Sequence, residues 1–184
     1  MKKNLLFLLC TLLPLASQAD SLTAIPRLDV NRYLGTWYEI AKYPNWFQRH
    51  CVADTTAQYD LNSDHQLSVL NRCRNSKGEI EQASGIARQL GGPDSARLEV
   101  SFAPTWLQIA PLVWGDYWVI DLDAKYQLAA VSEPTRKYLW ILSRTPQVKP
   151  SAYQSLLARL EVMGFDTSGL TLTPQTGMTA DQPN

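Results

Sequence analysis

Two short motifs, far apart in the chain, constrain the fold most strongly. Residues 35–39 read Gly-Thr-Trp-Tyr-Glu, and residues 138–144 read Tyr-Leu-Trp-Ile-Leu-Ser-Arg. An early strand with a Gly-x-Trp start and a late strand that ends in arginine predict a sheet whose first and last strands are neighbours. The guanidinium of Arg144 would then lie on the face of Trp37, a structural cation–π contact of about 0.5–2 kcal/mol. The motifs therefore predict a closed barrel, and its interior is where function is to be sought.

Strand-like runs alternate with turn-forming residues along most of the chain, the spacing typical of an all-β barrel or sandwich. Asn, Asp, Gly and Pro punctuate the sequence at 62–64, 76–78, 91–94 and 133–134. The predicted strands are 36–42, 53–61, 66–74, 79–89, 96–102, 117–122, 126–131 and 137–144. Eight antiparallel strands close into a barrel wide enough for one small ligand. We therefore predict an eight-stranded up-and-down antiparallel β-barrel.

One α-helix is predicted after the last strand. Pro150 suits its first turn and Gly164 suits its C-terminal cap. Between them apolar residues recur at helical spacing: Tyr153, Leu156, Leu157, Leu160 and Met163. We expect this stripe to pack on the outside of the barrel. A short strand is expected at 170–173, and residues 174–184 read as a mobile C-terminal tail.

Residues 1–19 have the pattern of a secretory signal peptide. Two lysines precede an apolar stretch over residues 5–16, and small residues lead to a cleavage site at Ala19. The apolar stretch is shorter than the about 20 residues that a spanning helix needs. Cys10 lies inside it, behind two leucines, which argues against lipid attachment. The predicted organisation is a signal peptide over 1–19 and one domain over 20–173, in a chain exported to the periplasm.

Charge and cysteine content narrow the function classes. The chain has 17 basic and 17 acidic residues, so loss of the two signal-peptide lysines leaves 15 basic against 17 acidic. This near-neutral balance gives no indication that the protein binds nucleic acid. Cys51 and Cys73 remain, and an even count in an exported chain predicts a disulfide. His50 and His65 fall at opposite ends of the predicted barrel, so neither a metal site nor a cofactor is predicted.

The motifs also resemble those of a known family. Residues 29–41, Asp-Val-Asn-Arg-Tyr-Leu-Gly-Thr-Trp-Tyr-Glu-Ile-Ala, resemble the opening of the lipocalins, and residues 117–123 and 138–146 resemble their later motifs. The resemblance is closest to bacterial lipocalins of the outer-membrane lipoprotein type, and extends to apolipoprotein D and plant temperature-induced lipocalins. It implies a barrel closed near Trp37 and open at a mouth, with association with the outer membrane. The turn that reaches Tyr126 is one residue shorter than the family pattern.

Alternation along the strands predicts which side chains enter the interior. It directs Thr55, Ala57 and Tyr59 inward on one strand and Leu67, Val69 and Asn71 on the next. The resemblance places Tyr59, Tyr117 and Trp140 in the pocket, and Tyr138 shares the parity of Trp140. The predicted ligand-binding residues are Glu39, Tyr59, Val69, Leu98, Val100, Phe102, Tyr117, Tyr138 and Trp140. Two interpretations of Glu39 stay open: a group that positions a ligand or acts as an acid, and a hydrogen-bonded interior carboxylate.

An apolar run stands where a loop is expected. Residues 106–114, Trp-Leu-Gln-Ile-Ala-Pro-Leu-Val-Trp, connect two predicted strands at the mouth, and exposed apolar patches usually mark contact surfaces. The residues predicted to contact a membrane surface, or to fold over the ligand as a lid, are Trp46, Phe47, Trp106, Leu107 and Trp114. The alternative is that they pack together or form a homodimer contact.

The predicted interior favours a lipid with one acyl chain. Burial of each methylene contributes about 0.8 kcal/mol, and micromolar binding needs about 8.2 kcal/mol after the cost of ordering. We therefore predict binding, storage or transport of a fatty acid or lysophospholipid in the cell envelope, for membrane maintenance. No nucleophile–base pair is evident, so no enzyme is predicted. The alternatives are a lipocalin-fold enzyme that uses Glu39 on an isoprenoid or lipid, and a protein that binds a partner through the Trp-rich loop.

Overall fold

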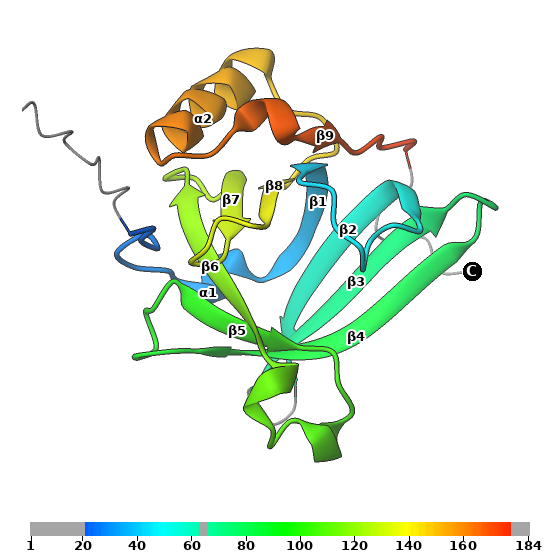
Figure 1. The fold of residues 1–184 in the computed structure, drawn as a ribbon, viewed down its shortest axis with the longest axis vertical. Helices are drawn as coiled ribbons and strands as arrows, with labels where there is room; N and C mark the ends of the chain where they lie inside the picture. The colour runs from blue at the N-terminus through cyan, green and yellow to red at the C-terminus, as the bar shows by residue number, and fades with distance from the viewer. Residues whose placement is uncertain (1–20, 63–65, 178–184) are drawn as a thin grey trace, which may run out of the picture.

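The chain folds into a closed antiparallel β-barrel (Figure 1). The computed structural model describes residues 21–62 and 66–177, so the predicted signal peptide lies outside the described residues. Each of the eight barrel strands pairs with the next, and β1 pairs with both β2 and β8. The strands are β1 Gly35–Lys42, β2 Cys51–Leu61, β3 Leu67–Asn75, β4 Ile80–Gln89, β5 Arg97–Ser101, β6 Gly115–Leu122, β7 Leu128–Ser132 and β8 Leu139–Ser143. The predicted eight-stranded barrel is confirmed.

Strand ends differ slightly from those predicted: β5 and β8 are shorter at both ends and β7 starts two residues later, whereas β2 and β6 start earlier because their pairing continues into segments whose sequence resembles a loop. β2 begins at Cys51, opposite Asn75, and β6 begins at Gly115, opposite Val100. Four short helical turns were not predicted: α1 Val30–Tyr33, η1 Thr105–Leu107, η2 Pro111–Val113 and η3 Thr167–Gly169. The sequence does carry a signal for α1, namely Asp29, a residue type favoured at helix N-caps. In the structure its side chain accepts a hydrogen bond from the Arg32 amide.

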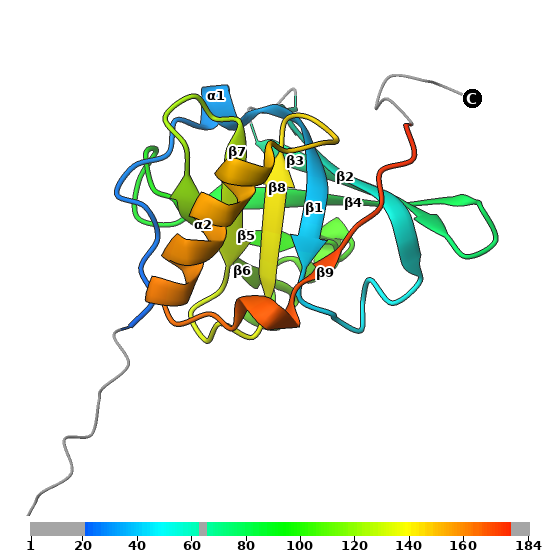
Figure 2. The same ribbon diagram turned by 90° about the horizontal axis from the view of Figure 1, so that it is seen from above.

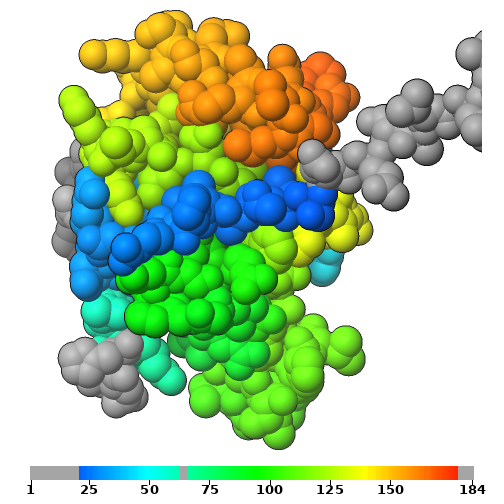
Figure 3. All heavy atoms as spheres, turned by 90° about the vertical axis from the view of Figure 1, so that its left-hand side faces the viewer, coloured from blue at the N-terminus to red at the C-terminus, as the bar shows by residue number. Residues whose placement is uncertain are grey.

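The N-terminal segment closes one end of the barrel. It crosses the outer surface between the C-terminal helix and the strands near β5 (Figure 3), held by bonds from the Ile25 amide to the Val119 carbonyl and from the Leu28 amide to the Asp94 carbonyl. Leu28 and Tyr33 are buried with Trp37 in the lower interior. Because these side chains fill this end, the open end must lie opposite, where β1 ends and β2 begins. We call that end the mouth.

The predicted helix is confirmed as α2, Pro150–Val162, and it packs outside the barrel (Figures 1 and 2). Leu156 and Leu160 are fully buried against the outward side chains of β1, β6, β7 and β8. The helix ends in a Schellman turn, in which the Gly164 amide donates to the Glu161 carbonyl and the Phe165 amide to the Leu160 carbonyl. Gly164 has φ 86°, which explains why glycine suits this position.

A C-terminal strap, residues 171–176, completes the wall between β1 and β2. The β1–β2 ladder ends at Tyr38 opposite Thr56. Beyond that point β9, Thr171–Leu172, pairs with β1, and the Asp54 amide on β2 donates to the Pro174 carbonyl. Figure 2 shows the segment running from β9 across to β2. Residues 174–176, predicted to belong to a mobile tail, are therefore bonded to the barrel, and residues 178–184 lie outside the described residues.

The predicted disulfide is confirmed. Cys51 and Cys73 are joined across β2 and β3 with their Cα atoms 5.5 Å apart. Beyond this bond the β3–β4 hairpin extends past the body of the barrel (Figures 1 and 2). The disulfide thus holds β2 to β3 at the base of this hairpin.

Candidate functional site

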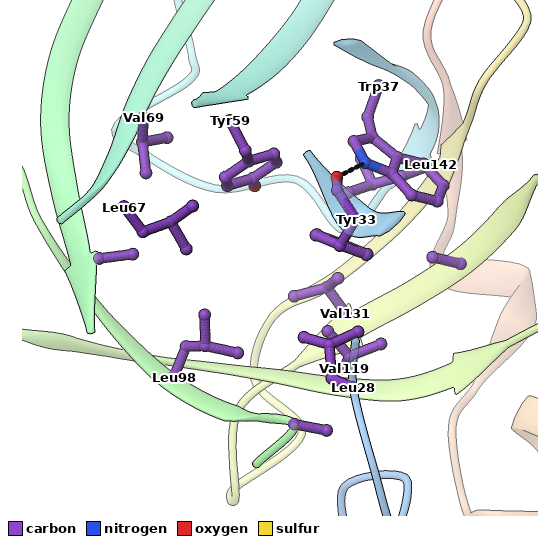
Figure 4. Close-up of a cluster of buried hydrophobic side chains, with 13 residues drawn as sticks. Leu28, Tyr33, Trp37, Tyr59, Leu67, Val69, Leu98, Val119, Val131 and Leu142 are labelled. Carbon is purple, nitrogen blue, oxygen red and sulfur yellow. Dashed lines mark hydrogen bonds between the residues drawn. The ribbon is translucent and has the colours of Figure 1, made fainter. Parts of the chain in front are cut away.

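The lower interior of the barrel is lined by apolar and aromatic side chains from several strands. Tyr59, Leu67, Val69 and Leu98 are buried and point toward one another (Figure 4). Val100, Tyr117 and Trp140 are partly buried and pack against the same cluster. The burial of Tyr59, Leu67, Val69 and Leu98 agrees with the alternation read from the sequence for β2, β3 and β5, and Tyr117 and Trp140 lie where the family resemblance implied. These residues form an apolar surface that faces inward from all sides.

The closed end contains the predicted cation–π pair. Trp37 is fully buried, and the guanidinium carbon of Arg144 lies 4.0 Å from its ring centroid. Arg144 also donates to the carbonyls of Thr36 and Arg32, and the Trp37 indole nitrogen donates to the Tyr33 carbonyl at 2.8 Å. Gly35 has φ 90°, and a Cβ there would lie 3.4 Å from Arg144. These bonds join the first and last barrel strands to α1.

Three tyrosine hydroxyls form a hydrogen-bonded group within this apolar region. The Tyr117 hydroxyl accepts from Tyr59 at 2.8 Å and lies 2.9 Å from that of Tyr33. Burial raises the pKa of Tyr59 to about 12 and raises the pKa values of Tyr33 and Tyr117 well above their usual range. All three phenols are therefore neutral at physiological pH. Tyr33 was not among the predicted site residues, because α1 was not predicted.

Three successive inward positions in the middle of β4 carry small side chains. Ala83, Gly85 and Ala87 lie opposite Asn71, Val69 and Leu67 of β3. A Cβ on Gly85 would lie 2.5 Å from the Ser101 carbonyl oxygen and 2.8 Å from the Phe102 ring. Glycine is therefore required for the close approach of β5. Phe102, predicted to line the pocket, follows the end of β5 and is 44% exposed.

The upper interior contains a polar network around Glu39, which is 2% exposed. Its carboxylate accepts from Lys42 Nζ at 2.6 Å, Gln48 Nε2 at 2.8 Å and Thr173 Oγ1 at 2.6 Å. Gln48 also accepts from the Trp140 indole nitrogen. This geometry matches the hydrogen-bonded interpretation of Glu39, since both carboxylate oxygens already have partners. Gln48 and Thr173 were missed because a loop and the C-terminal strap bring them to Glu39.

The loop at 43–50 places aromatic side chains at the mouth. The Phe47 ring lies 5.5 Å from Tyr138 and 6.2 Å from Trp140, and Trp46 contacts Phe47 edge-on. Tyr138 and Trp140 stack on each other at 5.8 Å. Trp46 is 70% exposed. These four residues form a continuous aromatic group from the outer surface to the upper interior.

The apolar run at 103–114 does not join this aromatic group. Figure 1 shows it on the opposite side of the barrel from the loop at 43–50. Trp114 packs against the outer surface, with the Arg88 guanidinium 4.0 Å from its ring centroid, and Leu107 is half-buried. Trp106, Ile109 and Leu112 are 73%, 90% and 97% exposed. The predicted single apolar rim is therefore two separate surfaces, because the loop folds outward along β4.

The strap is bonded to the carboxylate of Asp54, which a left-handed backbone, φ 54°, directs out of the regular β2 ladder. Burial raises the pKa of this carboxyl, but hydrogen bonds from the Thr176 hydroxyl and amide and from Arg74 outweigh burial and hold the pKa below its ordinary value. The negative charge of Asp54 therefore stabilises the closed wall between β1 and β2.

Asp54→Asn is expected to lower the free energy of unfolding at pH 7 by about 2 kcal/mol, because it removes charge-assisted hydrogen bonds. A carboxyl with a lowered folded-state pKa stabilises above its unfolded pKa of about 3.9 and loses that contribution as pH falls through the folded value. The difference in urea unfolding between wild type and variant should therefore be full at pH 7, begin to shrink at about pH 4 and vanish only below the lowered folded-state pKa of Asp54. Asp60→Asn, at an exposed position on the same strand, is the control. A variant as stable as wild type at pH 7 would refute this role.

Two absences apply to the described residues. Within residues 21–62 and 66–177, no three His, Cys, Asp or Glu side chains gather as metal ligands would. The same part of the chain contains no helix long and apolar enough to cross a membrane.

Comparisons with known proteins agree with this geometry. The sequence profile described as "Lipocalin-like domain" matches residues 28–175. The chain is 41% identical over 162 residues to temperature-induced lipocalin-1 of Arabidopsis thaliana, covering 86% of each chain. It is 41% identical over 156 residues to the outer membrane lipoprotein Blc of Escherichia coli (strain K12), covering 84% of each. It is 33% identical over 154 residues to apolipoprotein D of Mus musculus, covering 80% of this chain and 77% of the relative.

Solved structures show the same fold at lower sequence identity. Insecticyanin from the tobacco hornworm Manduca sexta superposes with a TM-score of 0.65 at 17% identity, covering 88% of this chain and 87% of that chain. At this identity the match supports the barrel architecture alone.

Proposed function

Because this chain belongs to the lipocalin family, we propose that it binds a single-chain lipid, a fatty acid or a lysophospholipid, inside its barrel. The observation that carries the proposal is the apolar interior: Tyr59, Val69, Leu98 and Val100 face the same space as the small residues of β4. Such a surface with few polar groups is typical of a small-molecule site. The family assignment agrees with the resemblance read from the motifs.

The cell envelope is the proposed place of action. One relative is named as an outer membrane lipoprotein, and the sequence of residues 1–19 predicts export. Storage or transport of lipids for membrane maintenance would fit both an envelope location and a lipid ligand. Fractionation of the source cells, with N-terminal sequencing of the mature chain, tests this part: a chain recovered from the cytoplasm with residues 1–19 intact would contradict it.

Native mass spectrometry of the protein purified from its own cells is the direct test of binding. We expect a bound species that is released by solvent and identified as a fatty acid or lysophospholipid. Ala83→Trp should abolish uptake, because position 83 is on the inner face of β4 opposite Asn71. Ser84→Trp, the next residue and on the outer face, is the matched control. Protein that is free of lipid and takes up neither lipid when it is added would refute the proposal.

An enzyme that uses Glu39 is the less favoured function. A general acid or base must exchange protons with a substrate, whereas the Glu39 carboxylate is bonded to Lys42, Gln48 and Thr173. No catalytic activity is therefore proposed. Conversion of a bound lipid by wild type, lost in Glu39→Gln, would revive the enzyme interpretation.

We also propose that the loop at 103–114 contacts a membrane surface. It contains no charged residue, and Trp106, Ile109 and Leu112 are between 73% and 97% exposed. Apolar residues at such a protrusion are expected to enter the lipid interface. The aromatic group at Trp46 and Phe47 is proposed as a lid over the mouth.

The triple substitution of Trp106, Ile109 and Leu112 by serine is expected to reduce liposome binding at least tenfold, since apolar burial drives such contacts. Co-sedimentation with vesicles of phosphatidylethanolamine and phosphatidylglycerol measures it. Val162→Ser, at an exposed position on α2, is the control. Unchanged sedimentation would reject the membrane role, and a simultaneous fall in mass by light scattering would assign the loop to a homodimer.

A further inference from the structure

Two polar atoms in the upper interior have no hydrogen-bond partner among the described residues. They are Thr55 Oγ1 and Asn71 Oδ1, and the Thr55 residue is 6% exposed. Buried polar atoms in folded proteins are almost always hydrogen-bonded to protein or to another bound group. Both atoms therefore indicate a place where the interior is prepared for a polar group.

The two side chains lie on the same inner face of neighbouring strands. Asn71 pairs with Ala57 across the β2–β3 ladder, so Thr55, two residues before Ala57, is its diagonal neighbour, within reach of the same bound group. Ala57 packs against the interior cluster, which sets the inward direction of both. The disulfide of Cys73 holds the strands together on the mouth side of the pair.

Polarity changes along this face from the mouth to the closed end. Below Thr55 and Asn71 come Ala57 and then Tyr59 opposite Val69, and these side chains belong to the apolar lower interior. Polar atoms deeper inside are already satisfied, since the hydroxyls of Tyr33, Tyr59 and Tyr117 bond to one another. A ligand with a polar group next to an acyl chain would match this gradient.

The hydrogen-bonding capacity of Thr55 and Asn71 indicates which polar group of a ligand would fit between them. A carbonyl oxygen such as Asn71 Oδ1 accepts hydrogen bonds, and a threonine hydroxyl donates or accepts. Lys42, which turns toward the interior from β1, is paired with Glu39 at 2.6 Å, and the alternating inward positions of β2 and β3, from Thr55 to Tyr59 and from Leu67 to Cys73, are uncharged. An ionised carboxylate brings no donor for Asn71 Oδ1, whereas a hydroxyl satisfies both atoms.

We propose that Thr55 and Asn71 form a subsite for a hydroxyl group of the bound lipid, of the kind that an acylglycerol carries next to its ester. This inference rests on the proposed function and deepens it, because it favours lysophospholipids and monoacylglycerols over free fatty acids. The hydroxyl donates to Asn71 Oδ1 and exchanges a hydrogen bond with Thr55 Oγ1. The acyl chain then extends toward Tyr59, Val69 and Leu98.

The test compares two ligands that differ by one hydroxyl: 1-palmitoyl lysophosphatidylcholine and its 2-deoxy analogue. Wild type is expected to bind the hydroxyl-bearing lipid about tenfold more tightly by fluorescence titration, as one or two hydrogen bonds of ordinary strength would give. Thr55→Val keeps the shape of the side chain, and together with Asn71→Leu it should abolish the preference for the hydroxyl-bearing lipid. Thr56→Val, on the outer face of β2, is the matched control.

The outcomes separate this inference from the function on which it rests. Equal binding of the two lipids by wild type, or a preference that survives in Thr55→Val and in the double variant, overturns the subsite and leaves lipid binding intact. If wild type binds none of the three ligands (the two lysophosphatidylcholines and palmitate), the proposed function itself is refuted. If the double variant does not fold, Thr55→Val alone decides, and a preference reduced several-fold in that variant supports the subsite.

Discussion

Trp37→Ala is expected to lower the free energy of unfolding by about 4 kcal/mol, the range for a large aromatic side chain removed from a core. Trp37 is fully buried and packs between the Tyr33 ring, 4.7 Å away, and the Arg144 guanidinium. Its loss leaves a cavity at the closed end and removes the bond to the Tyr33 carbonyl. Urea unfolding of the disulfide-bonded protein measures the effect.

Trp106→Ala is the matched control, because Trp106 is 73% exposed and exposed substitutions usually change stability by less than about 0.5 kcal/mol. Arg144→Met, combined with Trp37→Ala in a double-mutant cycle, should show a coupling energy of about 0.5–2 kcal/mol for the cation–π contact. A loss of less than about 1 kcal/mol in Trp37→Ala would contradict the central role of this residue in barrel closure.

Reduction of the Cys51–Cys73 disulfide is expected to lower the free energy of unfolding by about 3 kcal/mol, the chain-entropy value for a loop of this length. The bond joins residues 22 positions apart and Cys73 is buried. Urea unfolding with and without dithiothreitol measures the change. The double variant Cys51→Ala, Cys73→Ala should unfold at the lower midpoint in both conditions, which makes it a control for any other effect of the reductant.

Because the disulfide lies beside the proposed hydroxyl subsite, its reduction should also weaken lipid binding. The bond holds β2 to β3 where the ladder is irregular, at the register shift between Ala53 and Thr56. A midpoint that does not respond to reductant, together with two free thiols by mass spectrometry in the purified protein, would contradict the predicted role.

Much of the site could be predicted from residue order, and the reason is the period of a β-strand. Successive side chains point to opposite faces, so the inward positions of Tyr59, Val69 and Leu98 followed once the strands were recognised. The helical stripe that buries Leu156 and Leu160 was equally readable. These features depend on residues close together in the chain.

The outward fold of the loop at 103–114 could not be predicted in this way. Trp114 lies on the outer surface, where its ring packs against the guanidinium of Arg88 on β4. The sequence of the loop alone does not indicate that Arg88 is its partner. The engagement of Glu39 was likewise hidden, since its partners Lys42, Gln48 and Thr173 come from a strand, a loop and the strap.

Residue order alone predicted the closed barrel with its closing pair Trp37 and Arg144 from two motifs, the apolar inner face from strand alternation, and the disulfide from an even cysteine count in a chain predicted to be exported. In contrast, how the wall between β1 and β2 is completed, and which inner polar atoms lack partners, depends on contacts between distant parts of the chain. Asp54 bonds to Thr176, 122 residues away, and whether Thr55 and Asn71 are satisfied depends on every element around them. Contacts of that range depend on how the whole chain packs, which no local pattern encodes.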